Sequence, residues 1–430
     1  MELITYSLRT VAEAIIKPTY LLMLIVFGVI FYLKNKRTSM IQQMTIGEVI
    51  DTPLELTLSQ LVIGILAGTI GSIILSILGV SFGNNSGIEF IFITSILLLI
   101  IRPRLVCFAY SGAVLGAVSM ILNIILNSIG KQSYINVNIL SLTSFIAVLH
   151  MIEGIIVMVD GNRGAIPVFS NRDNKIIGGF SFNRYWTIPI AVMIMISGDS
   201  SGTGIISAPA YNWWPIIKDS NLMTMLAVAS LTFVPFYGVI GYSSVTFTKR
   251  KKEKVIGAGI GIFLYGVSLL IVSQLCSIGL MGEILALVYM PLGHELLIKF
   301  ERMREKRGEY LYVSDENGIS ILEVAPNSVA FEAGIRRGDK ILAINGEPVT
   351  SEVDILKAVK ESTAMLPIKI KSQYGKINDY ILQPGNRRLG VLLFQVVPLS
   401  HETMTRHKCR TPLMQWQTPS LAQPMKLWKD

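Results

Sequence analysis

The pair His294-Glu295 has the clearest chemical potential in this sequence. A HExxH helix turns two imidazoles to one face, where they bind zinc, and its glutamate serves as a base. Here Ile298 stands where the second histidine would be, so one ligand is missing. His150 and Glu153 lie in another apolar segment and could supply ligands instead. A buried polar network that joins two helices explains the cluster of His150, Glu153, His294 and Glu295 more simply, so we expect neither a metal nor a catalytic residue.

A second run, Gly198-Asp199-Ser200-Ser201-Gly202, has the residue types of a serine nucleophile. A nucleophilic serine needs a base within hydrogen-bond reach, and His294 lies toward the opposite end of its own apolar segment. We therefore expect no serine catalysis. The cysteines, Cys107, Cys276 and Cys409, form no CxxC pair and predict neither a disulfide framework nor a zinc knuckle. The sequence has no phosphate-binding loop and no dinucleotide fingerprint, so we expect no cofactor.

The composition is that of a membrane protein. Hydrophobic residues make up 51% of the 430 residues and charged residues only 16%, whereas soluble chains carry about 25% charged residues. The mean hydropathy is +0.54. The net charge of +9 comes from basic residues at the ends of apolar blocks, so membrane lipid is the expected partner and nucleic acid is not. The predicted transmembrane domain covers 18–298 and has about nine helices, at 18–33, 59–80, 88–101, 105–126, 139–159, 187–206, 222–245, 255–275 and 278–298.

The basic residues also predict an orientation. If all nine segments cross, the clusters that follow the first, third, fifth, seventh and ninth segments lie on one side, which the positive-inside rule makes the cytoplasm. We therefore expect a multi-pass protein of the cell membrane with its N-terminus outside. Residues 1–17 have apolar residues at helical spacing and predict an interfacial helix. Residues 299–308 are expected to form a basic juxtamembrane linker.

The chain becomes charged and mixed after the last apolar segment, which predicts a small cytoplasmic α+β module at 309–400. Strands are expected at 319–324, 340–344, 347–350, 367–372 and 378–382, with a hairpin at Asn345-Gly346. Ser351 and Asp354 predict a capping box at the start of a helix over 351–362. Residues 401–430 are polar, contain three prolines and predict a disordered tail.

The module resembles a PDZ domain of the bacterial, circularly permuted type. The resemblance rests on the run from Ala325-Pro326-Asn327-Ser328 through Ala333-Gly334-Ile335-Arg336-Arg337-Gly338-Asp339 to Asn345-Gly346. It implies that a protein or peptide partner binds as an extended strand beside a sheet edge. The expected peptide-binding residues are Gly318, Ile319, Ser320 and Ile321 on a strand, and Val353 and Leu356 on the helix. The loop for the peptide carboxylate could be 318–321 or 389–392.

The layout as a whole resembles the MinJ family of Gram-positive bacteria, whose members help to position the division site. This resemblance implies a membrane-embedded scaffold that bridges a curvature-sensing protein and a division inhibitor. The residues themselves predict the wider function, a scaffold whose module captures a peptide segment, with a homo-oligomer as a further possibility. Two alternatives remain open: an inactive descendant of an intramembrane zinc metalloprotease, based on His294-Glu295, and a transporter regulated by its PDZ domain.

Overall fold

The computed structural model describes a helical part and a small mixed module. The described residues are 2–101, 105, 107–131, 133, 135–172, 175–197, 205–207, 212–218, 229–314, 318–349, 351–362, 365–384 and 389–393. The expected tail, 401–430, lies outside them. In the N-terminal part the helices are α1 (Glu2–Ile16), α2 (Pro18–Ile46), α3 (Pro53–Leu78), α4 (Phe90–Ile101), α5 (Phe108–Ser128), α6 (Ile139–Asp160), α8 (Lys251–Ser273) and α9 (Leu280–Arg307), with the 3-10 helix η2 (Gln274–Ile278).

Among the described residues, six helical segments are long and apolar enough to cross a membrane: Pro18–Ile46, Pro53–Leu78, Phe108–Ser128, Ile139–Asp160, Lys251–Ile278 and Leu280–Arg307. They coincide with six of the nine expected segments. The expected segment at 88–101 is α4, whose 12 residues are too few for a bilayer that needs roughly 20. Nine transmembrane helices are therefore not what the described residues form.

The other two expected helices are strands. Segments 187–206 and 222–245 fall largely on β3 (Lys175–Ser197) and β5 (Ala229–Thr246), which pair as a long antiparallel ribbon. Pro189 and Pro235 lie inside these segments. In a helix each would remove a hydrogen bond and clash with the preceding turn, whereas valine, isoleucine and aromatic residues around them favour strands.

Short strands cover parts of the ribbon's edges. On one edge of β3, β2 (Ile166–Arg172) and β1 (Ser81–Gly83) pair with its two ends. On the other edge, β6 (Tyr312–Val313) pairs with β3 just before β5 begins to do so. Strand β4 (Ile205–Ser207) pairs with β5. The middle of β3, between the partners β2 and β1, is covered by a helix instead.

That helix is α3, which packs its small residues directly against the strand backbone. A Cβ atom added at Gly64 would lie 2.1 Å from the carbonyl oxygen of Thr187, and one at Gly68 would lie 2.1 Å from that of Pro189. One turn further along α3, Ser72 Oγ accepts a hydrogen bond of 2.9 Å from the backbone N–H of Ala191. Because Pro189 has no N–H, this edge has one fewer donor to satisfy. The small residues of α3 therefore let this helix lie directly against the edge of β3, in the place that a paired strand would otherwise take.

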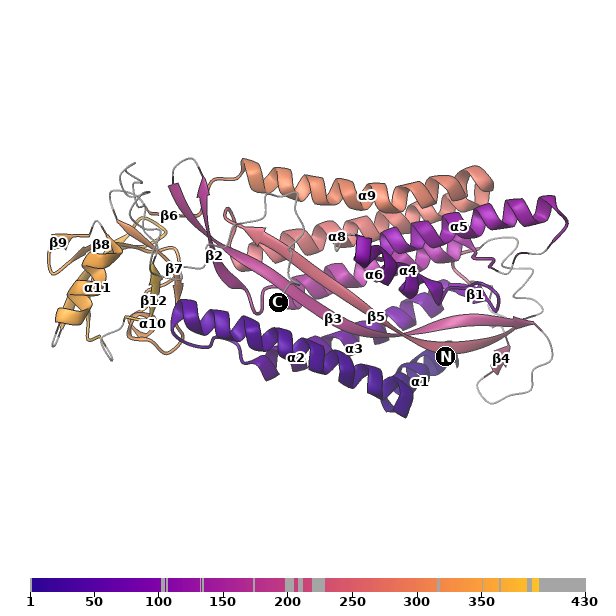
Figure 1. The fold of residues 1–430 in the computed structure, drawn as a ribbon, viewed down its shortest axis with the longest axis horizontal. Coiled ribbons are helices and arrows are strands. Elements are labelled where there is room, and N and C mark those ends of the chain that lie inside the picture. Colours follow the sequence, from indigo (N-terminus) through magenta and orange to yellow (C-terminus); the bar gives the residue numbers. More distant parts are fainter. Residues whose placement is uncertain are drawn as a thin grey trace.

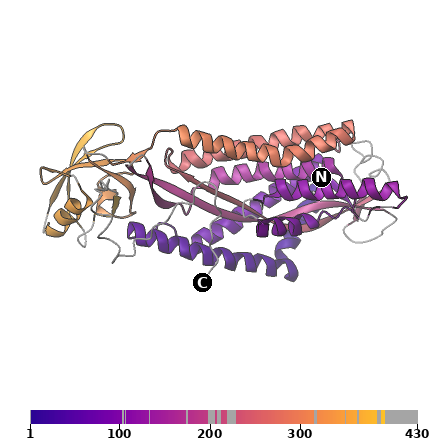
Figure 2. The ribbon, with the colours of Figure 1, turned by 45° about the horizontal axis from the view of Figure 1, so that its top comes forward.

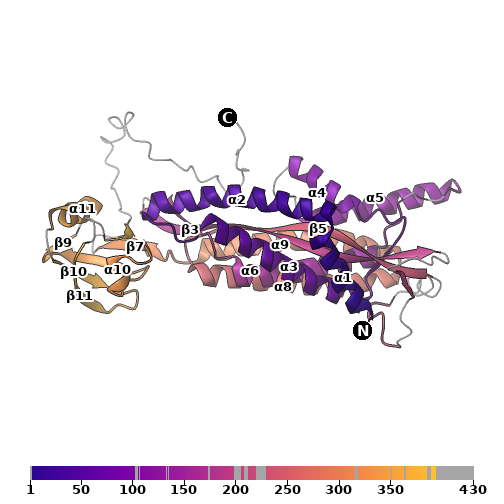
Figure 3. The same ribbon diagram turned by 90° about the horizontal axis from the view of Figure 1, so that it is seen from below.

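The ribbon runs along the long axis of the molecule between two sets of helices. Figure 1 shows α2 on one side of β3 and β5 and α8 and α9 on the other, while α3 lies along the edge of β3 and contacts α6, where a Cβ added at Gly71 would lie 2.4 Å from Ile152. Helix α2 follows the ribbon for much of its length in the view from below (Figure 3). The main hydrophobic core lies along β3, with Phe180, Phe182 and Trp186 fully buried. The ribbon is therefore internal to the helical part rather than an appendage.

The C-terminal module stands at one end of the long axis in every view (Figures 1, 2 and 3). Its sheet has the strand order β11-β10-β8-β7-β12, with β9 paired to β8. The capping box predicted from Ser351 and Asp354 is confirmed. The elements are β7 (Ile319–Val324), α10 (Val329–Glu332), β8 (Lys340–Ile344), β9 (Glu347–Pro348), α11 (Glu352–Glu361), β10 (Leu366–Lys371), β11 (Ile377–Leu382) and β12 (Val391–Leu393).

The two parts are joined firmly. The expected linker at 299–308 is the last turns of α9, and β6 then pairs with β3. Glu305 accepts hydrogen bonds from the backbone N–H groups of Phe247 at 2.7 Å and Thr248 at 3.1 Å. Lys251 of α8 forms an ion pair with Glu323 of β7, and both side chains are largely buried. Burial raises the pKa of the Tyr312 phenol to about 12, so it stays neutral at the junction.

The close contact between α3 and β3 predicts a large effect from one methyl group. Gly68→Ala should lower stability by about 1–3 kcal/mol, because the added Cβ meets a backbone oxygen that cannot move away alone. Thermal unfolding of the purified protein in detergent measures this. In the control Gly257→Ala, the nearest atom to the added Cβ is Lys249 Nζ at 3.9 Å. This change should be neutral or stabilising by up to about 1 kcal/mol. Equal melting temperatures for the two variants would contradict the packing of α3 on β3.

Candidate functional site

The strand order of the module's sheet ends at β11 and at β12. Strand β7 is hydrogen-bonded to β12 on one side and to β8 on the other. By contrast, β12 ends the strand order of the sheet, and β7 is its one strand partner among the described residues. An added peptide strand needs an edge with unpaired N–H and C=O groups. Within this half of the sheet β12 offers such an edge and β7 does not.

This arrangement changes the expected role of Gly318, Ile319, Ser320 and Ile321. Ile319 and Ile321 point into the core of the module, and Ser320 is held by its own hydrogen bonds to residues 313 and 314. These residues build the interior of the sheet, and β7 has a strand on each side, so β12 is the better candidate for the peptide edge. The alternative stretch, 389–392, leads into β12. Gly390 there has a φ of +72°, and its N-terminal neighbour Leu389 is buried in the core.

Helix α11 presents two different faces. Ile355 and Val359, one turn apart, are 1% and 3% exposed and pack in the core with Leu389 and Leu393. Val353 and Leu356 are 66% and 49% exposed. Core packing alone therefore does not account for these two apolar residues. An edge strand and an exposed apolar face on a helix that shares its core are the two parts of a PDZ groove.

In the helical part of the chain, which we call the membrane part from here on, the structure brings only some of the candidate residues together. The rings of His150 on α6 and His294 on α9 have centroids 5.9 Å apart. Glu295 accepts a hydrogen bond of 2.7 Å from the Tyr110 hydroxyl. Glu153 is half-buried one turn along α6 from His150. The sequence analysis missed Cys107, whose Sγ atom lies 3.1 Å from His150 Nε2. The serine run at 198–202 lies outside the described residues.

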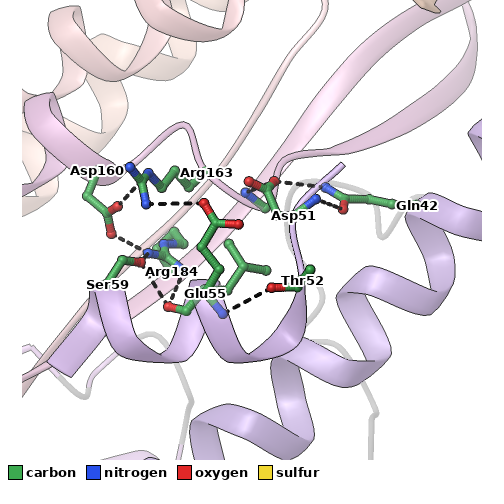
Figure 4. Close-up of polar contacts among 10 residues, drawn as sticks. Gln42, Asp51, Thr52, Glu55, Ser59, Asp160, Arg163 and Arg184 are labelled. Atoms are coloured by element: carbon green, nitrogen blue, oxygen red, sulfur yellow. Dashed lines mark hydrogen bonds and ion pairs between the residues drawn. The ribbon is translucent and has the colours of Figure 1, made fainter. Parts of the chain in front are cut away.

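A second polar cluster, also unpredicted, lies between the start of α3 and the end of α6 (Figure 4). Arg184 of β3 forms an ion pair with Asp160 at the end of α6, and both side chains are buried. Arg184 also donates to the carbonyl of Leu56 at 3.2 Å and to Ser59 Oγ at 2.7 Å. Trp186 Nε1 donates to Asp160 at 2.8 Å. This cluster joins the ribbon to α3 and α6. Because Arg184 and Asp160 are buried and bonded to these elements, we assign the cluster a structural role.

Neighbouring contacts extend the cluster toward α2. Arg163 lies 3.4 Å from Asp160 Oδ1 and 4.0 Å from Glu55 (Figure 4). Asp51 accepts hydrogen bonds from Gln42 at 3.4 Å and from the backbone N–H of residue 164 at 3.1 Å. The two loops that follow α2 and α6 are therefore held together at the end of the helices that faces the module.

Comparison with known proteins supports the assignment of the module. The sequence family of the PDZ domain matches residues 320–366, so the chain contains a PDZ domain. "Cell division topological determinant MinJ" of Bacillus subtilis is 20% identical over 240 residues, which are 54% of this chain and 55% of MinJ. This similarity supports a MinJ-like architecture, and with the apolar helices it indicates a membrane protein.

Other relatives are similar in the PDZ domain alone. "Serine protease HTRA4" of Mus musculus is 36% identical over 83 residues, or 19% of this chain and 16% of its own length. "Periplasmic serine endoprotease DegP" of Escherichia coli is 29% identical over 85 residues, or 20% of this chain and 17% of its own. The chain thus spans about half of MinJ and less than a fifth of these proteases. The matches to proteases do not include a catalytic domain.

The buried pair predicts a strong response to a change of charge. Asp160→Asn leaves the Arg184 guanidinium buried without its counter-ion and should cost about 3–5 kcal/mol. Replacing both partners, as Asp160→Leu with Arg184→Met, should cost less than that single change. The control Glu13→Gln removes an exposed pair with Lys17 and should have little effect. Denaturant titrations in detergent report each value. A mild effect of Asp160→Asn, equal to that of Glu13→Gln, would rule out a structural role for the pair.

Proposed function

We propose that this protein is a membrane-embedded scaffold whose PDZ domain captures a peptide segment of a partner protein in the cytoplasm. The observation that carries the proposal is an edge strand, β12, that shares its core with helix α11, whose other face exposes Val353 and Leu356. A peptide would extend the sheet along β12 through backbone hydrogen bonds, and alternate side chains would contact Val353 and Leu356. The backbone bonds would supply affinity and the helix would select apolar side chains.

We also propose a role in placing the division site, which the similarity to MinJ supports. That protein is named as a topological determinant of cell division, and it shares about half its length with this chain. The similar part extends beyond the size of the PDZ domain, unlike the matches to the proteases. A non-enzymatic adaptor therefore fits better than a protease, and Ile298 at the second ligand position of the His294-Glu295 pair agrees with it.

The distribution of basic residues again supports an orientation for the membrane part, although two of the expected helices are the strands β3 and β5. The ribbon β3–β5 runs along the long axis and back (Figure 1). It thus returns the chain to the side from which it came, as two crossing helices would. The basic residues in the second halves of α2 and α9, and those after α6 and β5, then share the side of the PDZ domain. The positive-inside rule makes this side the cytoplasm.

The groove can be tested with one charge. Val353→Lys in the full-length protein should abolish peptide binding and leave the unfolding of the PDZ domain cooperative, because residue 353 is exposed and a lysine there reaches water. A displayed library of C-terminal and internal peptides, selected on the protein in lipid nanodiscs, supplies the ligand. Fluorescence anisotropy then gives its affinity for each variant.

Two further variants separate the groove from the fold. Ile355→Lys places an unpaired charge in the core and should unfold the domain. Ile381→Lys changes a residue of β11 that is as exposed as residue 353 and should leave both stability and binding unchanged. If Val353→Lys binds the selected peptide as tightly as the parent, the groove lies elsewhere.

The orientation has its own test. Reporters fused after residue 252 and after residue 310 should both report the cytoplasm, and one inserted in the 207–218 loop should report the outside. These sites lie at opposite ends of the ribbon and its helices. A cytoplasmic signal from the 207–218 insertion would show that the ribbon does not cross the membrane.

A further inference from the structure

Three possible metal ligands from three different elements meet in the interior of the membrane part. Cys107 directly precedes α5, His150 lies in the middle of α6, and His294 lies in the middle of α9. One ligand atom from each residue lies within 4.8 Å of the other two. His150 is buried, and the other two residues are half-buried. No sequence motif unites them, because 43 residues separate Cys107 from His150 and a further 144 separate His150 from His294.

The surroundings of His150 orient its ring for ligation. Its Nδ1 atom lies 2.8 Å from the carbonyl oxygen of Ile146, which can only accept a hydrogen bond. The proton of the neutral imidazole is therefore on Nδ1, and the lone pair is on Nε2. That Nε2 atom is the one that lies 3.1 Å from Cys107 Sγ. Metal-bound histidines are held by this type of Nδ1–H contact to a backbone carbonyl or a carboxylate.

His294 has a comparable arrangement through a tyrosine. Tyr110 donates its hydroxyl proton to Glu295 Oε1 at 2.7 Å. Its oxygen, 3.2 Å from His294 Nδ1, can then accept the Nδ1 proton. This tautomer carries the lone pair of His294 on Nε2. Glutamate, tyrosine and histidine thus form a chain of contacts of the type that supports a metal-bound imidazole.

We propose that Cys107, His150 and His294 bind a transition-metal ion, for which zinc fits the donors best. A thiolate with two imidazoles is a donor set that zinc prefers, and hard ions such as magnesium or calcium do not. Binding displaces the thiol proton to solvent, and the thiolate with the nearby Glu295 carboxylate balances the two positive charges of the ion. Three protein ligands leave a fourth position for water or a neighbouring carboxylate. The site would fasten α5, α6 and α9 together.

A hydrogen-bonded network without metal is the competing explanation, and cobalt distinguishes the two. The full-length protein, purified in detergent and treated with chelator, is titrated with Co²⁺. A tetrahedral site with one thiolate should give a sulfur-to-cobalt charge-transfer band that saturates at roughly one ion per chain and that zinc abolishes. Elemental analysis of untreated protein should find zinc at a similar ratio. Absence of the thiolate band in the folded parent protein would overturn the proposal.

Variants locate the site. Cys107→Ser should remove the charge-transfer band, and His150→Gln should weaken cobalt binding strongly. Cys276 lies in the 3-10 helix η2, outside the proposed cluster. Cys276→Ser should therefore leave the charge-transfer band and the cobalt affinity unchanged. Retention of the band in a folded Cys107→Ser protein would also overturn the assignment. Tyr110→Phe removes the hydroxyl that contacts His294 and donates to Glu295, and should lower zinc affinity about 10- to 100-fold.

One measurement does not depend on the folding of any ligand variant. In a Cys276→Ser/Cys409→Ser background, Cys107 is the single remaining thiol. Zinc should slow its reaction with a thiol reagent, because a metal-bound thiolate is less available for attack. Magnesium at the same concentration should not. Equal reaction rates with and without zinc would count against the site.

Discussion

The fold depends on satisfying the outer edge of one buried strand. A β-ribbon surrounded by apolar helices exposes backbone N–H and C=O groups that water does not reach, and each unpaired group is costly. Strand β3 meets this constraint with a different partner at each stretch: β2 at its start, α3 in the middle and β1 near its end. The glycines of α3, Ser72 and the missing N–H of Pro189 all serve this edge. Changing any one of them affects the pairing of the helix with the strand.

The same ribbon fixes the position of the PDZ domain. Strand β6 pairs with β3, Tyr312 packs its ring against Phe180 at 5.6 Å, and Lys251 links α8 to Glu323. Leu322 of β7 belongs to the core of the membrane part, and Leu392 of β12 packs against it. The domain therefore does not hang from a flexible tether. A captured peptide would therefore have a fixed position and orientation relative to the helices. This suits a scaffold more than an adaptor whose domain moves freely on a linker.

The sequence predicted local features well and long-range ones poorly. The capping box at Ser351, the strands of the PDZ domain and six of the long helices follow from nearest neighbours and periodicity. The ribbon was predicted as helices because strands buried on both faces have a continuous apolar pattern. The positive-inside rule could not correct this error, since an antiparallel ribbon and a helix pair return the chain to the same side. Strand β12 was missed as the open edge because the edge is a property of the sheet order. Cys107 was overlooked because its partners are distant in sequence.

The ribbon also constrains how the protein is made. A translocon releases apolar helices into lipid one at a time, but a strand whose edges are uncovered has no stable place there. Helix α3 is synthesised before β3 and is ready to receive it, whereas β5 follows and β6 comes only after α9. The elements that cover the outer edge of β3 thus all precede it in the chain, and only Ile177 and Gly178 pair with a strand that comes after α9. The order of synthesis therefore matches the order of packing, since the N-terminal helices and short strands exist before the strand whose edge they cover.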